Sequence, residues 1–168
     1  TDGLASARAL GPVASLKLVP VVARDIVAQA LGRPPVTVAL AGPAGSQALM
    51  TAPDALPGYQ ALIPDGGTFA NEAAARVIPT ITCYRPGRAA RDIQIPILFC
   101  VSTTDSVTPP DETLRYAATA PFGETKQYEA GHFDFYLGDP FEALVTDQLE
   151  FLTRHLAPTS GAVHPAAP

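Results

Sequence analysis

The sequence predicts an α/β protein in which two parallel strands are joined by a helix. Residues 95–101 form a continuous apolar run, which is typical of a strand buried on both faces of a parallel sheet. A helix signal follows, then a second strand at residues 124–129 and a long amphipathic helix from about residue 139. Two parallel strands joined by a helix require a right-handed crossover, so the helices are expected to pack against the sheet.

The first third of the chain is predicted to be mostly helical. In residues 1–33 apolar side chains recur at intervals of three and four, and Gly32 stands where a helix commonly ends. Pro20 interrupts this pattern and is expected to kink the helix or to split it into two. Residues 36–40 and 47–51 are short β-prone segments on either side of a Gly-Pro-Ala-Gly turn, a pattern that favours a hairpin.

Two further helical stretches are predicted before the apolar strand. The first runs from about residue 51 to residue 63, with a proline in its first turn, and a turn at residues 64–67 follows it. Residues 72–84 form the second stretch, which Pro79 disturbs. The Arg-Pro-Gly-Arg sequence at residues 85–88 is expected to end it.

Both helices of the last third have start signals. Thr108 is predicted to cap a helix that begins with two prolines and carries two acidic residues in its first turn. The sequence Asp-Pro-Phe-Glu at residues 139–142 is a capping sequence for the last helix. Residues 157–168 lack periodicity, and we expect a frayed tail there. The last helix is expected to place on one face Phe141, Leu144, Val145, Leu149, Leu152 and Leu156.

The composition argues against several classes of partner. The chain has 168 residues, 47% of them hydrophobic, and a formal net charge of −5, with 11 Lys and Arg against 16 Asp and Glu. Because no basic run exists, we expect neither nucleic-acid binding nor binding to an anionic membrane. No uncharged apolar stretch reaches the ~18 residues of a membrane helix. No secretory leader is visible, so we expect a cytoplasmic protein.

The chain is expected to be processed or to be a piece of a longer protein. It begins with Thr1, and its only methionine is Met50. A two-stranded sheet is very small, and residues 97–101 are too apolar for an edge strand. We therefore expect neighbouring strands that this sequence does not contain.

A candidate catalytic pair follows the two strands of the last third. Asp105 lies four residues beyond the first strand, and His132 lies three residues beyond the second. Functional groups of open parallel sheets collect at the carboxyl ends of the strands, so neighbouring strands would bring these two loops together. A carboxylate that accepts the imidazole proton is the orienting half of a nucleophile–histidine–acid relay, in which the histidine acts as general base and then as general acid.

Each of these residues also has a purely structural interpretation. An aspartate in a turn commonly binds its own backbone or caps a helix, and a histidine in a loop is commonly structural or merely exposed. Because Thr108 is assigned to the cap, Asp105 is not needed there, and its pairing with His132 favours a functional role. Asp134 has no second histidine nearby, so we predict no metal site.

The last third resembles the C-terminal part of the α/β-hydrolase family. The resemblance rests on Asp-Ser-Val-Thr-Pro-Pro after an apolar strand, on Gly-His-Phe after the next strand, and on the long final helix. It is specific over about residues 93–156. It implies that Asp105 is the acid and His132 the base of a Ser-His-Asp triad. It also implies that residues 1–92, with the short hairpin near residues 36–51, are a mostly helical lid or cap.

The sequence departs from the family at the nucleophile. The G-x-S-x-G elbow is absent, and the nearest imitation, at Ser46, lacks the second glycine and follows a turn. Ser102 and Ser106 lie in the loop of the acid, where the family places no nucleophile. We therefore expect the nucleophile and most of the sheet to lie upstream of this chain.

The resemblance implies an esterase-like hydrolase that needs neither a cofactor nor a metal. The expected substrate is a small, apolar acyl compound, contacted by Met50, Tyr59 and Phe133, although simple packing within the lid is the alternative role of such side chains. A homo-oligomer is also expected. The alternative function is that of a catalytically silent, truncated or interaction fragment that oligomerises through its exposed sheet edge.

Overall fold

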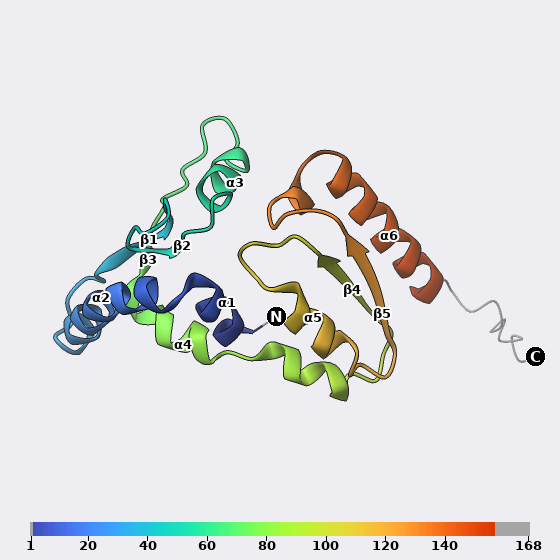
Figure 1. Cartoon of the computed structure of the whole chain (residues 1–168), viewed down its shortest axis with the longest axis horizontal. Helices are drawn as coiled ribbons and strands as arrows, with labels where there is room; N and C mark the ends of the chain where they lie inside the picture. The colour runs from blue at the N-terminus through green and yellow to red at the C-terminus, as the bar shows by residue number, and fades with distance from the viewer. Residues whose placement is uncertain (1, 157–168) are drawn as a thin grey trace, which may run out of the picture.

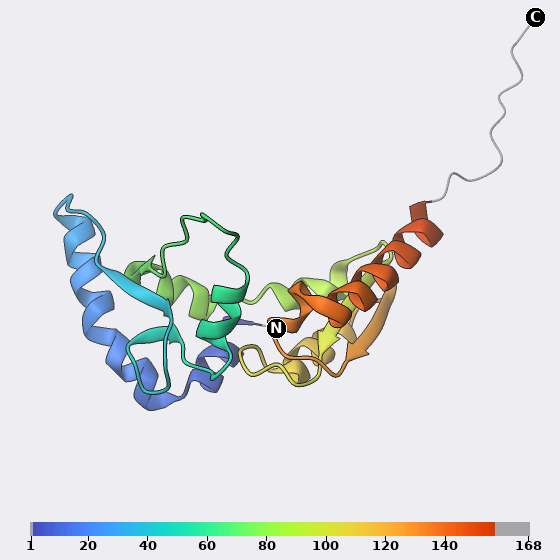
Figure 2. The same ribbon diagram turned by 90° about the horizontal axis from the view of Figure 1, so that it is seen from above.

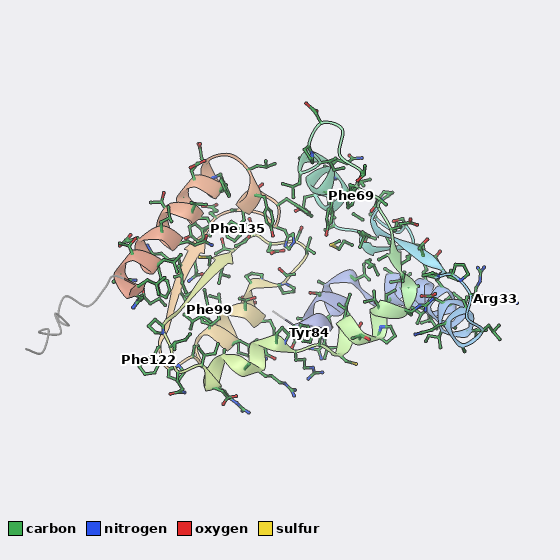
Figure 3. The ribbon with its side chains drawn as sticks, turned by 180° about the vertical axis from the view of Figure 1, so that it is seen from behind. Arg33, Phe69, Tyr84, Phe99, Phe122 and Phe135 are labelled. Atoms are coloured by element: carbon green, nitrogen blue, oxygen red, sulfur yellow. The ribbon has the colours of Figure 1, made fainter. Side chains whose placement is uncertain are left out.

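The computed structural model describes residues 2–156, and the predicted frayed tail at residues 157–168 lies outside the described residues. The chain forms two lobes that lie side by side (Figures 1 and 2). Arg33 and Phe122 lie at opposite ends of this elongated arrangement (Figure 3). The first lobe contains α1 (Gly3–Leu10), α2 (Pro12–Ala30), β1 (Thr37–Ala41), β2 (Ala48–Met50), α3 (Ala55–Ala61), β3 (Ala73–Ala74), η1 (Ala75–Val77) and α4 (Ile78–Cys83).

The helical start of the chain breaks at Gly11, whereas the sequence predicts a disturbance at Pro20. Gly11 has a φ of 89°, which glycine adopts without strain, and Pro12 then opens α2. Pro20 lies inside α2 on its exposed surface, and the carbonyl that loses its partner belongs to Leu16, which is also exposed. Water can therefore replace the lost hydrogen bond, and α2 continues to Ala30.

The first lobe holds a three-stranded sheet in the order β2-β1-β3. The predicted hairpin is wrong, because β1 and β2 run parallel, with Ala39 opposite Ala48 and Ala41 opposite Met50. The strands overlap only over these residues, so residues 42–47 have to return only ~7 Å along β1, which six residues span easily. β3, which the sequence does not predict, pairs antiparallel with the start of β1.

The segment expected to be one helix over residues 72–84 contains β3, η1 and α4. Pro79 stands in the first turn of α4, where its missing N–H costs nothing. It therefore helps to begin a helix at Ile78 and does not disturb one already under way. The helix expected from about residue 51 to residue 63 is the shorter α3.

A buried ion pair ties the first lobe together. Asp25 of α2 is fully buried, and its carboxylate accepts hydrogen bonds from the backbone N–H groups of Val36 and Arg76, both at 2.7 Å. The Arg76 guanidinium adds two more, at 2.9 and 2.7 Å. The bond from Arg76 outweighs the effect of burial and holds the pKa of Asp25 well below its usual range. One carboxylate thus joins α2, the start of β1 and η1.

The second lobe is built around two parallel strands, as the sequence predicts. They are in register from Ile97 opposite Gly123 to Ser102 opposite Tyr128, and within residues 2–156 the sheet has no third strand. In the strand at residues 97–102 only the carboxyl end is fully buried, so the expected burial of this whole strand on both faces is not observed. The elements are η2 (Pro86–Asp92), β4 (Ile97–Ser102), α5 (Pro110–Ala117), β5 (Gly123–Tyr128), η3 (Asp134–Tyr136) and α6 (Gly138–Leu156).

The apolar face expected on the last helix is only partly covered. Leu144 and Phe151 of α6 are buried, whereas Leu149, Leu152 and Leu156 are exposed. The two-stranded sheet is too narrow to cover a helix of this length. Among residues 2–156, no helix has both the length and the apolar character required to cross a bilayer.

Packing and a buried hydrogen bond join the two lobes. Phe133 of the second lobe lies in an apolar cluster with Ala41 and Ala55 of the first lobe. The hydroxyl of Tyr116 on α5 donates to Oδ2 of Asp2, 3.0 Å away, next to the start of α1. His132, which precedes Phe133 in the chain, lies at this junction.

Candidate active site

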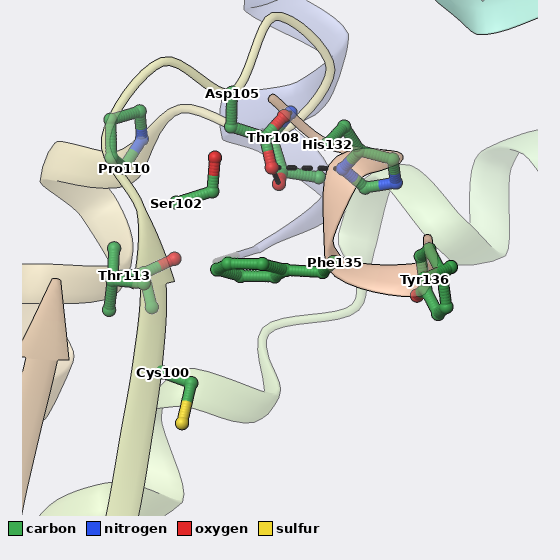
Figure 4. A pocket seen from close by; sticks show the side chains of 10 residues that line it. Cys100, Ser102, Asp105, Thr108, Pro110, Thr113, His132, Phe135 and Tyr136 are labelled. Atoms are coloured by element: carbon green, nitrogen blue, oxygen red, sulfur yellow. Dashed lines mark hydrogen bonds and ion pairs between the residues drawn. The ribbon is translucent and has the colours of Figure 1, made fainter. Parts of the chain in front are cut away.

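Asp105 and His132 lie where two neighbouring parallel strands end. Asp105 is in the loop after β4, and His132 is in the loop after β5. Because Ser102 and Tyr128 are paired at the carboxyl ends of these strands, the two loops leave the sheet side by side. Nδ1 of His132 is 2.9 Å from Oδ2 of Asp105, a hydrogen bond drawn in Figure 4. The structure therefore brings together the two residues that the sequence singles out.

The loop of Asp105 holds its carboxylate in place. Oδ1 accepts hydrogen bonds from the backbone N–H groups of Val107 and Thr108, at 2.8 and 2.6 Å, and Oδ2 accepts one from the Thr108 hydroxyl at 2.6 Å. The predicted helix cap is therefore wrong, because Pro109 occupies the cap position of α5 and the Thr108 hydroxyl binds Asp105. The Asp105 carboxylate closes the turn of residues 105–108 through its hydrogen bonds to the backbone, and this places it next to the Thr108 hydroxyl.

These contacts keep Asp105 ionised. Burial raises the pKa of its carboxyl, but the hydrogen bonds from His132, Thr108 and Val107 outweigh burial and lower that pKa to about 2. The Asp105 side chain is 9% exposed and that of His132 is 26% exposed. A carboxylate facing Nδ1 fixes the proton of the neutral imidazole on that atom, which leaves Nε2 as the acceptor. Among residues 2–156, no group hydrogen-bonds to Nε2.

Hydrogen bonds join the loop after β4 to the loop after β5, and a further one lies within the loop after β5. The backbone carbonyl of Ala130 accepts hydrogen bonds from the hydroxyls of Ser102 and Thr104. Asp134 accepts a hydrogen bond from the N–H of Gly131, at 2.6 Å. These bonds restrict the backbone on both sides of the histidine. Asp134 thus has a structural partner, and among residues 2–156 no group of three or more His, Cys, Asp or Glu is arranged to hold a metal ion.

A small cavity of about 190 Å³ lies beside the Asp–His pair (Figure 4). Phe135 and Tyr136, which follow His132 in the chain, form part of its wall. Cys100 also lines it, but burial raises the pKa of this thiol, which disfavours the thiolate that a nucleophile requires. Ser102, another lining residue, is buried and directs its hydroxyl at a backbone carbonyl.

A second cavity, of about 800 Å³, opens from His132 into the first lobe. Met50 and Tyr59, both predicted to contact substrate, line it. Phe133, the third predicted contact, is not among its lining residues. Its ring packs edge-on against Tyr59, with centroids 5.1 Å apart, and also against the ring of His132, at 4.9 Å. Phe133 is therefore placed to support both residues from behind.

One contact at the site has no counterpart in the sequence prediction. The Ser106 hydroxyl, in the loop of Asp105, donates a hydrogen bond to Asp54 at the start of α3. Asp54 stands next to Pro53 at a helix start, and this sequence signal indicates only a capping role. The partner is 52 residues away, and no local pattern encodes it.

Comparison with solved structures identifies the fold. The chain is similar to the α/β hydrolase GrgF from Penicillium sp. sh18, with a TM-score of 0.69 and 20% identity over 88% of this chain and 52% of GrgF. It is also similar to DcsB, solved in complex with a substrate analogue, with a TM-score of 0.63 and 20% identity over 86% of this chain and 51% of DcsB. The chain has the α/β-hydrolase fold and matches about half of the length of each of these solved structures. The predicted fold class is confirmed.

Sequence relatives give a similar coverage. The quorum-quenching protein AidA of Acinetobacter baumannii (strain MDR-ZJ06) is 48% identical over 154 residues, which are 92% of this chain and 51% of AidA. An uncharacterized 31.7 kDa protein of the traX-finO intergenic region of Escherichia coli is 32% identical over 76 residues, 44% of this chain and 27% of that protein. The chain thus spans about half or less of the length of these relatives. No family model matches it.

Proposed function

We propose that this chain is part of a serine-type α/β hydrolase that cleaves ester or related acyl bonds. In this proposal His132 is the general base and acid, and Asp105 orients it. The observation that carries the proposal is the 2.9 Å hydrogen bond between Nδ1 and a carboxylate that three further donors hold in place. A histidine held in this way presents Nε2, with its lone pair, toward a reacting hydroxyl.

The residues of this chain supply the proton transfers of acyl transfer. Nε2 of His132 takes the proton of the nucleophile as its oxygen attacks the substrate carbonyl, and the carboxylate of Asp105 stabilises the imidazolium that forms. Nε2 then gives the proton to the leaving alcohol, whose bond to the acyl carbon breaks. In the second half-reaction a water loses its proton to Nε2 and attacks the acyl-enzyme, and the proton returns to the nucleophile as the acid product leaves.

We place the nucleophile outside this sequence. The 168 residues contain no G-x-S-x-G elbow. Ser102 and Ser106 direct their hydroxyls at Ala130 and Asp54, respectively. The half-length match to AidA supports a longer protein that provides the missing residue.

The name of one relative supports a class of substrate. AidA is a quorum-quenching protein, and quenching requires the removal or inactivation of a signal molecule. A small signal that carries an ester or lactone bond would suit the chemistry proposed for His132. The substrate we propose is therefore a small acyl compound that contains an ester or lactone bond. We also propose that the protein is located in the cytoplasm.

A second candidate function rests on the uncovered strand. β4 has β5 on one side and, within residues 2–156, no strand on the other. An unpaired edge of this kind can pair with another chain. The chain would then be a catalytically silent fragment that forms homo-oligomers through this edge.

Steady-state hydrolysis of simple esters by the full-length protein separates the two. We expect turnover by the wild type and a loss of ~10³- to 10⁴-fold or more in kcat for His132→Ala. The matched control is His155→Ala, which removes a histidine of α6 that binds Glu124, packs against Phe151 and lines neither cavity; it should retain its kcat. Absence of turnover by the wild type would favour the silent fragment. Turnover by the isolated 168 residues would contradict a nucleophile outside them.

A further inference from the structure

The larger cavity is hollowed by small residues on one face of α1. It has a volume of about 800 Å³, within the range of small-molecule sites. Gly3, Ser6, Ala7 and Leu10 line it, and their spacing of three, four and seven places them on one side of the helix. Larger side chains at Ser6 and Ala7 would fill the space, and Gly3 lets α1 approach the Ile81 carbonyl of α4, where a Cβ would clash. The loops that follow β4 and β5 contribute Ser106, Val107, Thr108 and His132 to the lining.

The walls of this cavity carry no full charge. Apart from His132, its lining residues include no Lys, Arg, Asp, Glu or His. A charged group placed there would lose its hydration without gaining a partner, which is costly. The cavity is therefore suited to a neutral group. Aliphatic side chains contributed by the first lobe are Leu10, Leu18, Leu40, Leu49, Met50, Ile78 and Ile81.

Several hydroxyls in the wall already have partners. Thr82 donates to the carbonyl of Ile78 at 2.9 Å, and Ser15 donates to the carbonyl of Gly11 at 2.8 Å. Both bonds are made within the chain's own helical turns, so these residues turn little hydrogen-bonding capacity toward a ligand. The hydroxyl of Thr108 is likewise engaged, with Asp105. Contact with the first lobe is dominated by hydrocarbon, with the hydroxyls of Ser6, Thr51 and Tyr59 as the other polar groups of that wall.

We infer that this cavity binds an uncharged aliphatic chain of the substrate, with the scissile carbonyl held next to Nε2 of His132. The inference rests on the proposed hydrolase function and adds the part of the substrate that is recognised. The chain could belong to the acyl group or to the alcohol, since both present the same hydrocarbon surface. In either case selectivity for chain length is set by the first lobe and not by the catalytic loops.

Two series of esters hydrolysed by the full-length protein test the inference and assign the chain. One series varies the acyl group from acetyl to dodecanoyl with a fixed alcohol, and the other varies the alcohol with a fixed acetyl group. We expect kcat/KM to rise about threefold per methylene in one of the series, because each methylene leaves water for the cavity. A terminal carboxylate on the favoured chain should remove the gain. A flat profile in both series would overturn the inference and leave the hydrolase function standing.

A substitution that fills the cavity locates the binding site. Ala7→Phe should lower the ratio of kcat/KM for the decanoyl ester to that for the acetyl ester by ~10-fold or more, because the ring occupies space that the longer chain needs. The matched control is Ala23→Phe on the exposed side of α2, away from the cavity, which should leave the ratio unchanged. An unchanged ratio in a folded Ala7→Phe protein would contradict the inference.

A binding measurement tests whether the cavity binds an aliphatic chain, independently of ester hydrolysis. The fluorescence of the neutral probe N-phenylnaphthylamine is followed in full-length His132→Ala protein while decanol, butanol or decanoate is added. We expect displacement by decanol at concentrations at least ~10-fold lower than by butanol, and weak displacement by decanoate. This result would support the cavity even if no ester were hydrolysed. Equal displacement by all three compounds would overturn it.

Discussion

Asp105 combines the two roles that its sequence position suggests. One carboxylate oxygen accepts the backbone N–H groups of Val107 and Thr108, which is the ordinary behaviour of an aspartate in a turn. The other faces His132. The structural role of Asp105 in its turn and its proposed role beside His132 are therefore compatible, because the turn holds the carboxylate in the position from which it binds Nδ1 of His132.

Replacement of Asp105 tests its orienting role. Asp105→Asn keeps the size of the side chain but can direct its amide N–H₂ at Nδ1, which favours the wrong imidazole tautomer. We expect kcat for ester hydrolysis to fall by ~10³- to 10⁴-fold with little change in KM. Asp111→Asn, at an exposed position in the first turn of α5, is the control. A loss of less than tenfold in Asp105→Asn would contradict the role.

The low pKa of Asp105 also makes a contribution to stability that depends on pH. Its pKa is about 2 in the folded chain, below the usual value of ~3.9 in an unfolded chain, so unfolding is accompanied by proton uptake at low pH. The contribution, about 2 kcal/mol, is fully present above pH ~5 and is lost as the pH falls toward 2. Urea unfolding of wild type and Asp105→Asn should therefore differ near neutrality and converge in acid. A difference that stays constant down to pH ~2 would contradict this.

At the scale of the elements, α3 can approach the histidine loop closely because of one glycine. A Cβ built on Gly58 would lie 2.2 Å from Cγ of Phe133, far inside van der Waals contact. Phe133 is itself buried and packs against Tyr59 and His132. The glycine therefore determines how near the first lobe comes to the loop of His132.

Gly58→Ala should separate these two elements. We expect a loss of about 1–3 kcal/mol in the free energy of unfolding, because the added methyl group overpacks the junction. The double variant Gly58→Ala/Phe133→Leu should lose less than the sum of the single changes, since the smaller side chain makes room. Gln60→Ala, on the exposed side of α3, is the control and should change stability by no more than ~0.5 kcal/mol. Additive effects in the urea midpoints would contradict the clash.

Elements with strong local signals could be predicted, and those set by distant partners could not. The two parallel strands and α6 follow from apolar runs and capping residues. β3 consists of two alanines that are extended only because they pair with Thr37 and Val38. Pairing also decides the direction of β2, since a Gly-Pro-Ala-Gly turn is compatible with either orientation. Gly11, not Pro20, ends the first helix, because solvent satisfies the carbonyl that a proline leaves free.

For the molecule as a whole, the site is a property of both lobes. The second lobe supplies Asp105 and His132, and the first lobe supplies most of the cavity that opens from His132. The pair could be predicted because residues that follow adjacent parallel strands share one end of a sheet. The bond from Ser106 to Asp54 and the position of Phe133 could not, because each depends on how the two lobes meet.

The most direct test of the central proposal is the site of labelling by a serine-directed fluorophosphonate. The full-length protein is treated with the reagent, and the modified peptide is identified by mass spectrometry. We expect one labelled serine, outside the 168 residues of this chain, and a labelling rate reduced by ~10³-fold or more in His132→Ala. Labelling at Ser46, Ser102 or Ser106, or labelling that does not depend on His132, would contradict the proposal that this chain provides the acid and base of a triad.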